Sequence, residues 1–218
     1  MLFIELTLFE LKKALRSPAI FCEAVAFYFL SNLVFIFATN IVVATEQIYA
    51  FGICLTLFLF VALFNSEQFF KSDHKTGFLD QLLLIDPDLD SLLLSKYLAF
   101  LLINMLPLLV FTALLLFIYD VEPAAISYFS KLLALNLPLL TALIFFGASL
   151  TFRLESKNFL IFLLILPLLI PQIIFIMLQL ENYLAGQSSD YFNFMIFVNL
   201  LLLPILFLLS KLSLKSTY

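Results

Sequence analysis

Charged residues are scarce in this sequence. Asp, Glu, Lys and Arg make up 12% of its 218 residues and tryptophan is absent, whereas 64% of the residues are hydrophobic. The mean hydropathy is +1.16. A soluble domain carries about 25% charged and about 45–50% apolar residues, and one of this length still exposes much of its surface to water. The composition therefore excludes a soluble globular protein and predicts an integral membrane protein.

Glycine, histidine and cysteine are too few for several kinds of site. The four glycines stand singly, which excludes a phosphate-binding loop, so any ATP site must lie on another subunit. A zinc centre needs three or four ligands, and His74 is the only histidine. Cys22 and Cys54 lie within or beside apolar runs, which favours two buried apolar side chains over a redox or metal role. We expect no catalytic residue, no metal site and no nucleic-acid partner.

Six stretches of the chain carry no charged residue. They cover residues 24–45, 47–66, 97–119, 132–152, 158–180 and 191–210. About 20 helical residues cross the ~30 Å hydrocarbon core, and helix is expected because lipid cannot satisfy exposed backbone N–H and C=O groups. The sequence thus predicts an all-α membrane protein with one transmembrane domain over residues 1–218. With their flanking residues, the six helices span about 20–45, 47–66, 92–119, 128–152, 158–180 and 191–211.

The basic residues predict the orientation of these helices. If the N-terminus is cytoplasmic, ten of the eleven Lys and Arg residues fall in cytoplasmic segments, and only Lys131 lies outside. Cytoplasmic loops carry an excess of Lys and Arg, so the opposite orientation would reverse the rule. Both termini are therefore predicted to be cytoplasmic.

Residues 1–18 interleave charged and apolar side chains ahead of Ser17-Pro18, where a helix is expected to break. This pattern predicts an amphipathic helix lying in the cytoplasmic membrane interface. A disordered basic tail is the alternative.

Residues 67–91 form the longest connection, between the second and third spans. Within it, four apolar residues share one face of a predicted short helix that Asp86-Pro87 ends: Phe78, Leu79, Leu82 and Leu83. We expect a soluble partner protein to bind this cytoplasmic coupling helix and displace it.

The six uncharged stretches contain amides and prolines in place of Asp, Glu, Lys or Arg, which argues against a proton-coupled or ion-coupled carrier. These amides include Asn32, Asn104, Asn136, Gln172 and Asn199. Hydrogen bonds from such amides join helices, and we favour this role over a substrate site. Prolines kink helices, and the pair Pro167 and Pro171 is the predicted hinge. The prolines in these stretches are Pro107, Pro138, Pro167, Pro171 and Pro204.

The connection after the second span resembles the signature loop of the heme exporter protein B (CcmB) family. The residues that carry the resemblance are Glu67, Phe70, Asp73, Gly77, Leu79, Asp80 and Gln81. Two further segments are similar to the family, Phe9-Glu10-Leu11…Arg16 and Leu166-Pro167…Ile170-Pro171. The length, the six spans and the cytoplasmic termini also match.

The resemblance implies the membrane subunit of a type-2 ABC exporter that supplies heme, its possible substrate, for c-type cytochrome assembly. ATP would bind a separate ATPase subunit, and the chain itself would be no enzyme. The residues that would contact the ATPase are Glu67, Phe70, Lys71, Asp73, Gly77, Phe78, Leu79, Asp80 and Gln81.

Other expectations from the resemblance concern partners and location. They are two copies of the chain, a tryptophan-rich heme-handling membrane protein, and a bacterial inner membrane or a mitochondrial one. A permease for drugs, lipids or polysaccharides, a membrane enzyme and a structural scaffold are the alternatives.

Overall fold

The computed structural model describes residues 2–16, 18–39, 47–75, 89–151, 159–187 and 191–216. Helices occupy nearly all of these residues, and no strand occurs among them, which confirms the all-α prediction. The elements are α1 (Leu2–Arg16), α2 (Pro18–Thr39), α3 (Gln47–Lys75), α5 (Leu89–Phe100), η1 (Leu101–Met105), α6 (Leu106–Ile118), α7 (Pro123–Thr151), α8 (Phe159–Leu184) and α9 (Tyr191–Ser216).

Five helical stretches among the described residues are long and apolar enough to cross a membrane. They are Gln47–Ser66, Asp90–Ile118, Pro123–Leu150, Leu164–Leu184 and Phe192–Leu214. The predicted first span corresponds to α2, in which a shorter apolar stretch, Cys22–Ala38, meets the same composition. The chain is thus a multi-pass membrane protein, and the count of six spans stays a prediction.

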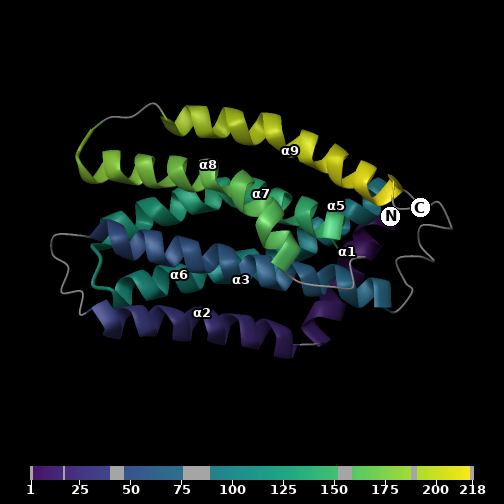
Figure 1. Cartoon of the computed structure of the whole chain (residues 1–218), viewed down its shortest axis with the longest axis horizontal. Coiled ribbons are helices and arrows are strands. Elements are labelled where there is room, and N and C mark those ends of the chain that lie inside the picture. The colour runs from purple at the N-terminus through teal and green to yellow at the C-terminus, as the bar shows by residue number, and fades with distance from the viewer. Residues whose placement is uncertain are drawn as a thin grey trace.

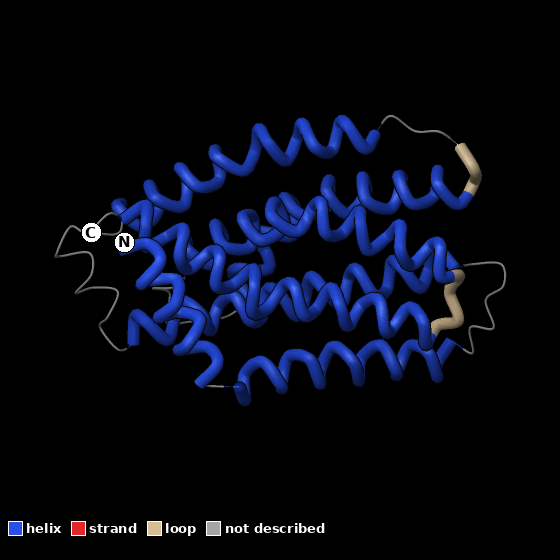
Figure 2. The backbone as a smooth tube through the Cα atoms, turned by 180° about the vertical axis from the view of Figure 1, so that it is seen from behind, coloured by secondary structure: helices blue, strands red, loops and turns tan. Residues whose placement is uncertain are grey.

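Both termini lie at the same end of the helical bundle (Figures 1 and 2). The predicted helix in residues 1–18 is confirmed as α1, which runs across that end of the bundle, and a disordered tail is ruled out over Leu2–Arg16. Helix α1 ends at Arg16, and α2 begins with Pro18, whose fixed φ suits the first helical position. The assignment of this end to the cytoplasm rests on the basic residues.

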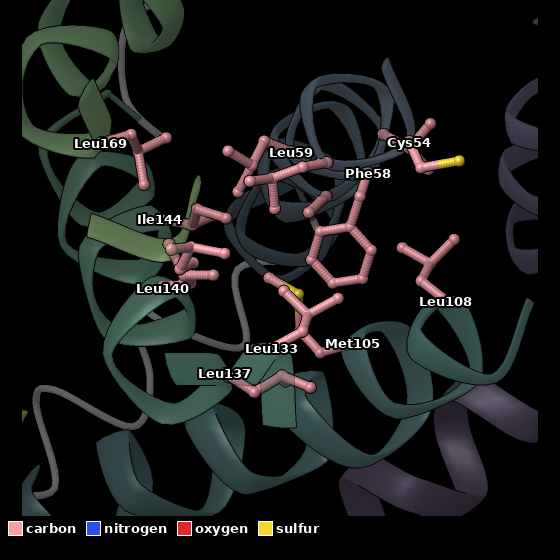
Figure 3. Close-up of a cluster of buried hydrophobic side chains, with 14 of the residues drawn as sticks. Cys54, Phe58, Leu59, Met105, Leu108, Leu133, Leu137, Leu140, Ile144 and Leu169 are labelled. Carbon is pink, nitrogen blue, oxygen red and sulfur yellow. The ribbon is translucent and has the colours of Figure 1, made fainter. Parts of the chain in front are cut away.

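Helix α7 is the centre of the bundle. In its apolar stretch 78% of the residues are buried, against 17% in α9, and α7 packs against α3, α6, α8 and α9. Figure 3 shows how side chains from several helices meet there. The labelled ones are Cys54, Phe58 and Leu59 of α3, Met105 of η1, Leu108 of α6, Leu133, Leu137, Leu140 and Ile144 of α7, and Leu169 of α8.

A π-helical segment, η1, interrupts the third span. Its wider turn is closed by the backbone N–H of Leu106, which donates to the carbonyl of Leu101. Pro107 follows at once, has no N–H to donate, and would clash with the carbonyl of Ile103 in a regular α-helix. The wider turn relieves this clash, so one of the predicted proline kinks takes the form of a π-segment.

The predicted hinge prolines, Pro167 and Pro171, both lie within α8, which runs without a break from Phe159 to Leu184. Both are exposed on the surface of the chain. Their role as a hinge stays a prediction.

Candidate coupling site

Helix α3 extends past the second predicted span. Its 29 residues make it about 44 Å long, more than the ~30 Å hydrocarbon core, so residues 67–75 continue beyond the span. This extension leaves the bundle at the end that holds both termini (Figure 1). The connection predicted over 67–91 is thus helical at its start, because residues 67–75 contain neither glycine nor proline, and α5 already begins at Leu89.

The predicted ATPase-contacting residues divide into two groups. Four lie on the backbone of the α3 extension: Glu67, Phe70, Lys71 and Asp73. The other five, together with the predicted coupling helix, lie outside the described residues: Gly77, Phe78, Leu79, Asp80 and Gln81. Helix α3 leads into the connection, and α5 leaves it. A displacement of the connection must therefore reach the bundle through these two helices.

A buried ion pair fastens α1 to α5. The Lys96 ammonium Nζ lies 2.8 Å from Glu10 Oε1, and the two residues are only 1% and 2% exposed. Taking one partner away from such a pair leaves an uncompensated buried charge, which costs about 3–5 kcal/mol. The pair therefore fixes how the two helices sit against each other.

Sequence reasoning counted Lys96 among the cytoplasmic basic residues and missed this contact. The signal that was available is Glu10, an acid within the Phe9-Glu10-Leu11 segment that resembles the family. Its partner lies 86 residues away along the chain, and only the packing of α1 on α5 brings the two together.

A second lysine of α1 lies near this pair. Partial burial and the positive charge of Lys96 lower the pKa of Lys13 below its ordinary value, while the Glu10 carboxylate opposes that shift. The region is thus a compact group of two ammonium groups and one carboxylate at the junction of α1 and α5.

Tyr97, next to Lys96, connects α5 to the central helix. Its hydroxyl donates a 2.8 Å hydrogen bond to the backbone carbonyl of Pro138, at the proline within α7. Its ring packs edge-on against Phe145 of α7 and Phe207 of α9, with centroids 6.1 and 5.2 Å away. A displacement of α5 would therefore act on α7 where the missing N–H of Pro138 weakens its helix.

Asp90, near the start of α5, forms an ion pair with Lys211 of α9, with Nζ 2.6 Å from Oδ1. The Asp90 side chain is 65% exposed, so this contact contributes only about 0.2–1 kcal/mol. It links α5 to α9 far more weakly than the buried pair links α5 to α1.

Two asparagines connect the helices on either side of the connection. Asn65 Nδ2 of α3 donates to Asn104 Oδ1 of η1 over 3.2 Å, and both residues are buried. Asn65 precedes the α3 extension directly, while Asn104 lies within the π-segment. The predicted role of Asn104 in joining helices is confirmed, and its position at η1 is where the structure adds to the prediction.

A polar cluster deeper in the bundle joins α2, α3 and α6. The Tyr28 hydroxyl lies 2.8 Å from Thr112 Oγ1 and donates to the backbone carbonyl of Cys54. Cys54 Sγ donates to Asn32 Oδ1, and the Tyr119 hydroxyl donates to the carbonyl of Asn32. Asn32 therefore joins helices as predicted, and the α6 side of η1 is fixed to α2.

The remaining predicted amides behave differently from one another. Asn199 Nδ2 of α9 donates to the carbonyl of Leu135 in α7, which confirms a joining role. Asn136 is fully buried but donates only to Leu132 of its own helix, and its Oδ1 has no donor among the described residues. Gln172 is buried on α8.

The two cysteines lie in different surroundings. Cys54 is buried, as predicted, but Cys22 is exposed, so the prediction that both are buried is wrong for Cys22. Among the described residues, α2 packs chiefly against α3 and α6, and Cys22 lies away from that packed face. The described residues contain no cluster of His, Cys, Asp or Glu that could hold a metal ion.

An apolar groove of about 440 Å³ lies between α2, α3 and α8. Its lining includes Phe35, Tyr49, Gly52, Thr56 and Met177, and no charged side chain lines it. Thr56 donates its hydroxyl to the carbonyl of Gly52, so its polar group is already satisfied within α3.

The comparisons with known proteins agree with this architecture. The family described as "CcmB protein" matches residues 1–210. "Heme exporter protein B" of Haemophilus influenzae is 29% identical over 88% of this chain and 86% of its own length. The protein of the same name from Pseudomonas aeruginosa is 29% identical over 83% of this chain and 81% of its own length. Since the family match covers nearly the whole sequence, the chain belongs to the CcmB protein family.

Proposed function

We propose that this chain is the membrane-spanning subunit of an ABC transporter that supplies heme for c-type cytochrome assembly. Membership of the CcmB family and the name of its relatives, heme exporter protein B, support this proposal. The chain is then a transporter component and not an enzyme. With four single glycines it has no phosphate-binding loop, so ATP is hydrolysed on a partner ATPase.

A role in coupling ATP hydrolysis to movement of the bundle is supported by the contacts that hold α5, the helix after the connection. The partner ATPase contacts residues 67–91, where Lys71, Asp73 and Asp80 make polar contacts and Phe70, Phe78 and Leu79 fill its groove. The α3 extension and α5 then carry the displacement into the bundle, through Glu10 to α1 and through Pro138 to α7.

The assembly and location follow from the same proposal. Two copies of the chain face two ATPase subunits, in a bacterial inner membrane, with both termini in the cytoplasm. A separate tryptophan-rich membrane protein handles heme on the outer side. The excess of Lys and Arg in the predicted cytoplasmic segments supports this orientation.

A heme stain of c-type cytochromes in cells that lack this gene tests the proposal. We expect covalent heme to disappear, to return with the intact chain, and not to return with a chain altered at Gly77–Asp80. Normal cytochromes in the deletion strain, with no second copy of the gene, would contradict the heme role and favour a permease for another substrate.

A further inference from the structure

We infer that Glu10 and Lys96 are positioning residues of the transport cycle: they hold α1 on α5 so that the two helices tilt together about η1. This inference rests on the proposed function, because the ATPase supplies the displacement. It assigns the moving unit to α1 and α5, and the pivot to the π-segment rather than to Pro167 and Pro171.

The first step of the inference concerns which helix α1 follows. Among the described residues, α5 is the principal packing partner of α1, although α1 adjoins α2 in the sequence. The Glu10–Lys96 pair lies in that contact, and it is buried, with side chains 3% and 1% exposed. Separating the helices would break the pair and leave two buried charges without each other, so α1 stays with α5 when α5 moves.

The second step concerns where α5 can bend. Immediately after α5, the backbone changes from α-helical to π-helical bonding over Leu101–Met105, and Pro107 removes one further donor. The hydrogen bonds along the helix axis are thus weakest between α5 and α6. Kinks in helices concentrate at prolines and π-bulges for this reason.

The third step concerns what stays still. Beyond η1, α6 is fixed to α2 by the hydroxyl pair Thr112 and Tyr28 and by the Tyr119 hydroxyl on Asn32. The polar contacts named here therefore differ on the two sides of η1: those before it reach α1, α7 and α9, and those after it reach α2. The Asn65–Asn104 hydrogen bond lies at the pivot itself.

The tilt would reach the rest of the bundle through the weaker contacts of α5. The Tyr97–Pro138 hydrogen bond acts on the proline of α7, and the exposed Asp90–Lys211 pair acts on the cytoplasmic end of α9. Either contact can break and re-form, unlike the buried pair at Glu10.

Spin-label distances in the purified complex of this chain with its ATPase test the inference. Labels go on three exposed positions, Lys12 of α1, Leu94 of α5 and Leu114 of α6, in a background with Cys22→Ala. Cys54 is kept because its thiol is buried. Distances are measured without nucleotide and with ATP bound to a hydrolysis-deficient ATPase.

We expect both the Leu94–Leu114 and the Lys12–Leu114 distances to change by about 2 Å or more on ATP binding, the scale of helix shifts in switching proteins. In the neutral double variant Glu10→Gln/Lys96→Met, the Leu94–Leu114 change should persist while the Lys12–Leu114 change is lost. Pro107→Ala restores a backbone donor next to η1 and should reduce both changes.

Two results would overturn the inference. One is an unchanged Leu94–Leu114 distance with ATP bound, which would show that η1 is no pivot. The other is a Lys12–Leu114 change that persists in the neutral double variant, which would show that the ion pair is not what makes α1 move with α5. A normal heme stain in the deletion strain would instead overturn the proposed function, so the two failures are distinguishable.

Discussion

The buried pair of Glu10 and Lys96 makes a quantitative prediction about stability. Replacing either residue alone with a neutral one, Glu10→Gln or Lys96→Met, leaves a charge in a site that is at most 2% exposed. This should cost about 3–5 kcal/mol of the free energy of unfolding. For a chain of 150–250 residues each kcal/mol lowers Tm by about 2–4 °C, so Tm should fall by about 6–20 °C.

The two single variants should not be equally unstable. The positive charge of Lys96 opposes protonation of Lys13, so Lys96→Met removes a repulsion as well as an attraction. Glu10→Gln, by contrast, keeps the repulsion between the two ammonium groups and removes the carboxylate charge that opposes it. We therefore expect Glu10→Gln to have the lower Tm of the two.

The double variant Glu10→Gln/Lys96→Met should recover most of the lost stability. Replacing both members of a buried pair by neutral groups of similar size is often neutral or stabilising, because no uncompensated charge remains. A matched control is Lys211→Met, which breaks the exposed pair with Asp90 and should lower Tm by at most about 4 °C.

Thermal unfolding of the purified chain in detergent, followed by the loss of monodisperse protein with temperature, measures these differences. Single variants that melt like the parent chain would show that the pair is not buried. A double variant as unstable as the sum of the two singles would show that the two charges do not interact.

Three further predictions concern other parts of the chain. Phe78→Asp should abolish stimulation of the partner ATPase while membrane insertion, followed by fractionation, stays normal; full stimulation would remove Phe78 from the coupling contact. Tyr97→Phe deletes the hydrogen bond to Pro138 and should cost about 1 kcal/mol, a fall in Tm of about 2–4 °C, whereas an unchanged Tm would mean that the bond does not form. In detergent, a maleimide should label Cys22 but not Cys54 before denaturation, and rapid labelling of both thiols would contradict the burial of Cys54.

The local character of the chain could be predicted from sequence because it depends on neighbouring residues only. A run of apolar residues cannot stay in water, and in lipid its backbone must bond within the segment, so composition alone predicts helices. The helix over Leu2–Arg16 and its end before Pro18 follow from the same kind of local information. The family also follows from short motifs, since such motifs are properties of the sequence itself.

The helix boundaries and the helix bends were harder to predict from the sequence. Helix α3 continues through residues 67–75, which contain neither glycine nor proline. The second span was instead predicted to end at residue 66, where the charged residues begin. Pro107 predicted a kink, but the sequence did not predict that the proline would follow a π-segment, in which Asn104 bonds to Asn65 of another helix.

Hydropathy by itself thus determined that this protein crosses the membrane as helices, and its basic residues predicted which end is cytoplasmic. Only the tertiary structure decided which polar groups meet. From the sequence, Glu10 was an acid of the interfacial helix and Lys96 a cytoplasmic lysine, with no sign that they pair. Cys22 and Cys54 looked alike, because hydropathy says nothing about which face of a helix is covered. The physical reason is that burial and pairing depend on helix packing between residues far apart in the chain, and the coupling site consists of such contacts.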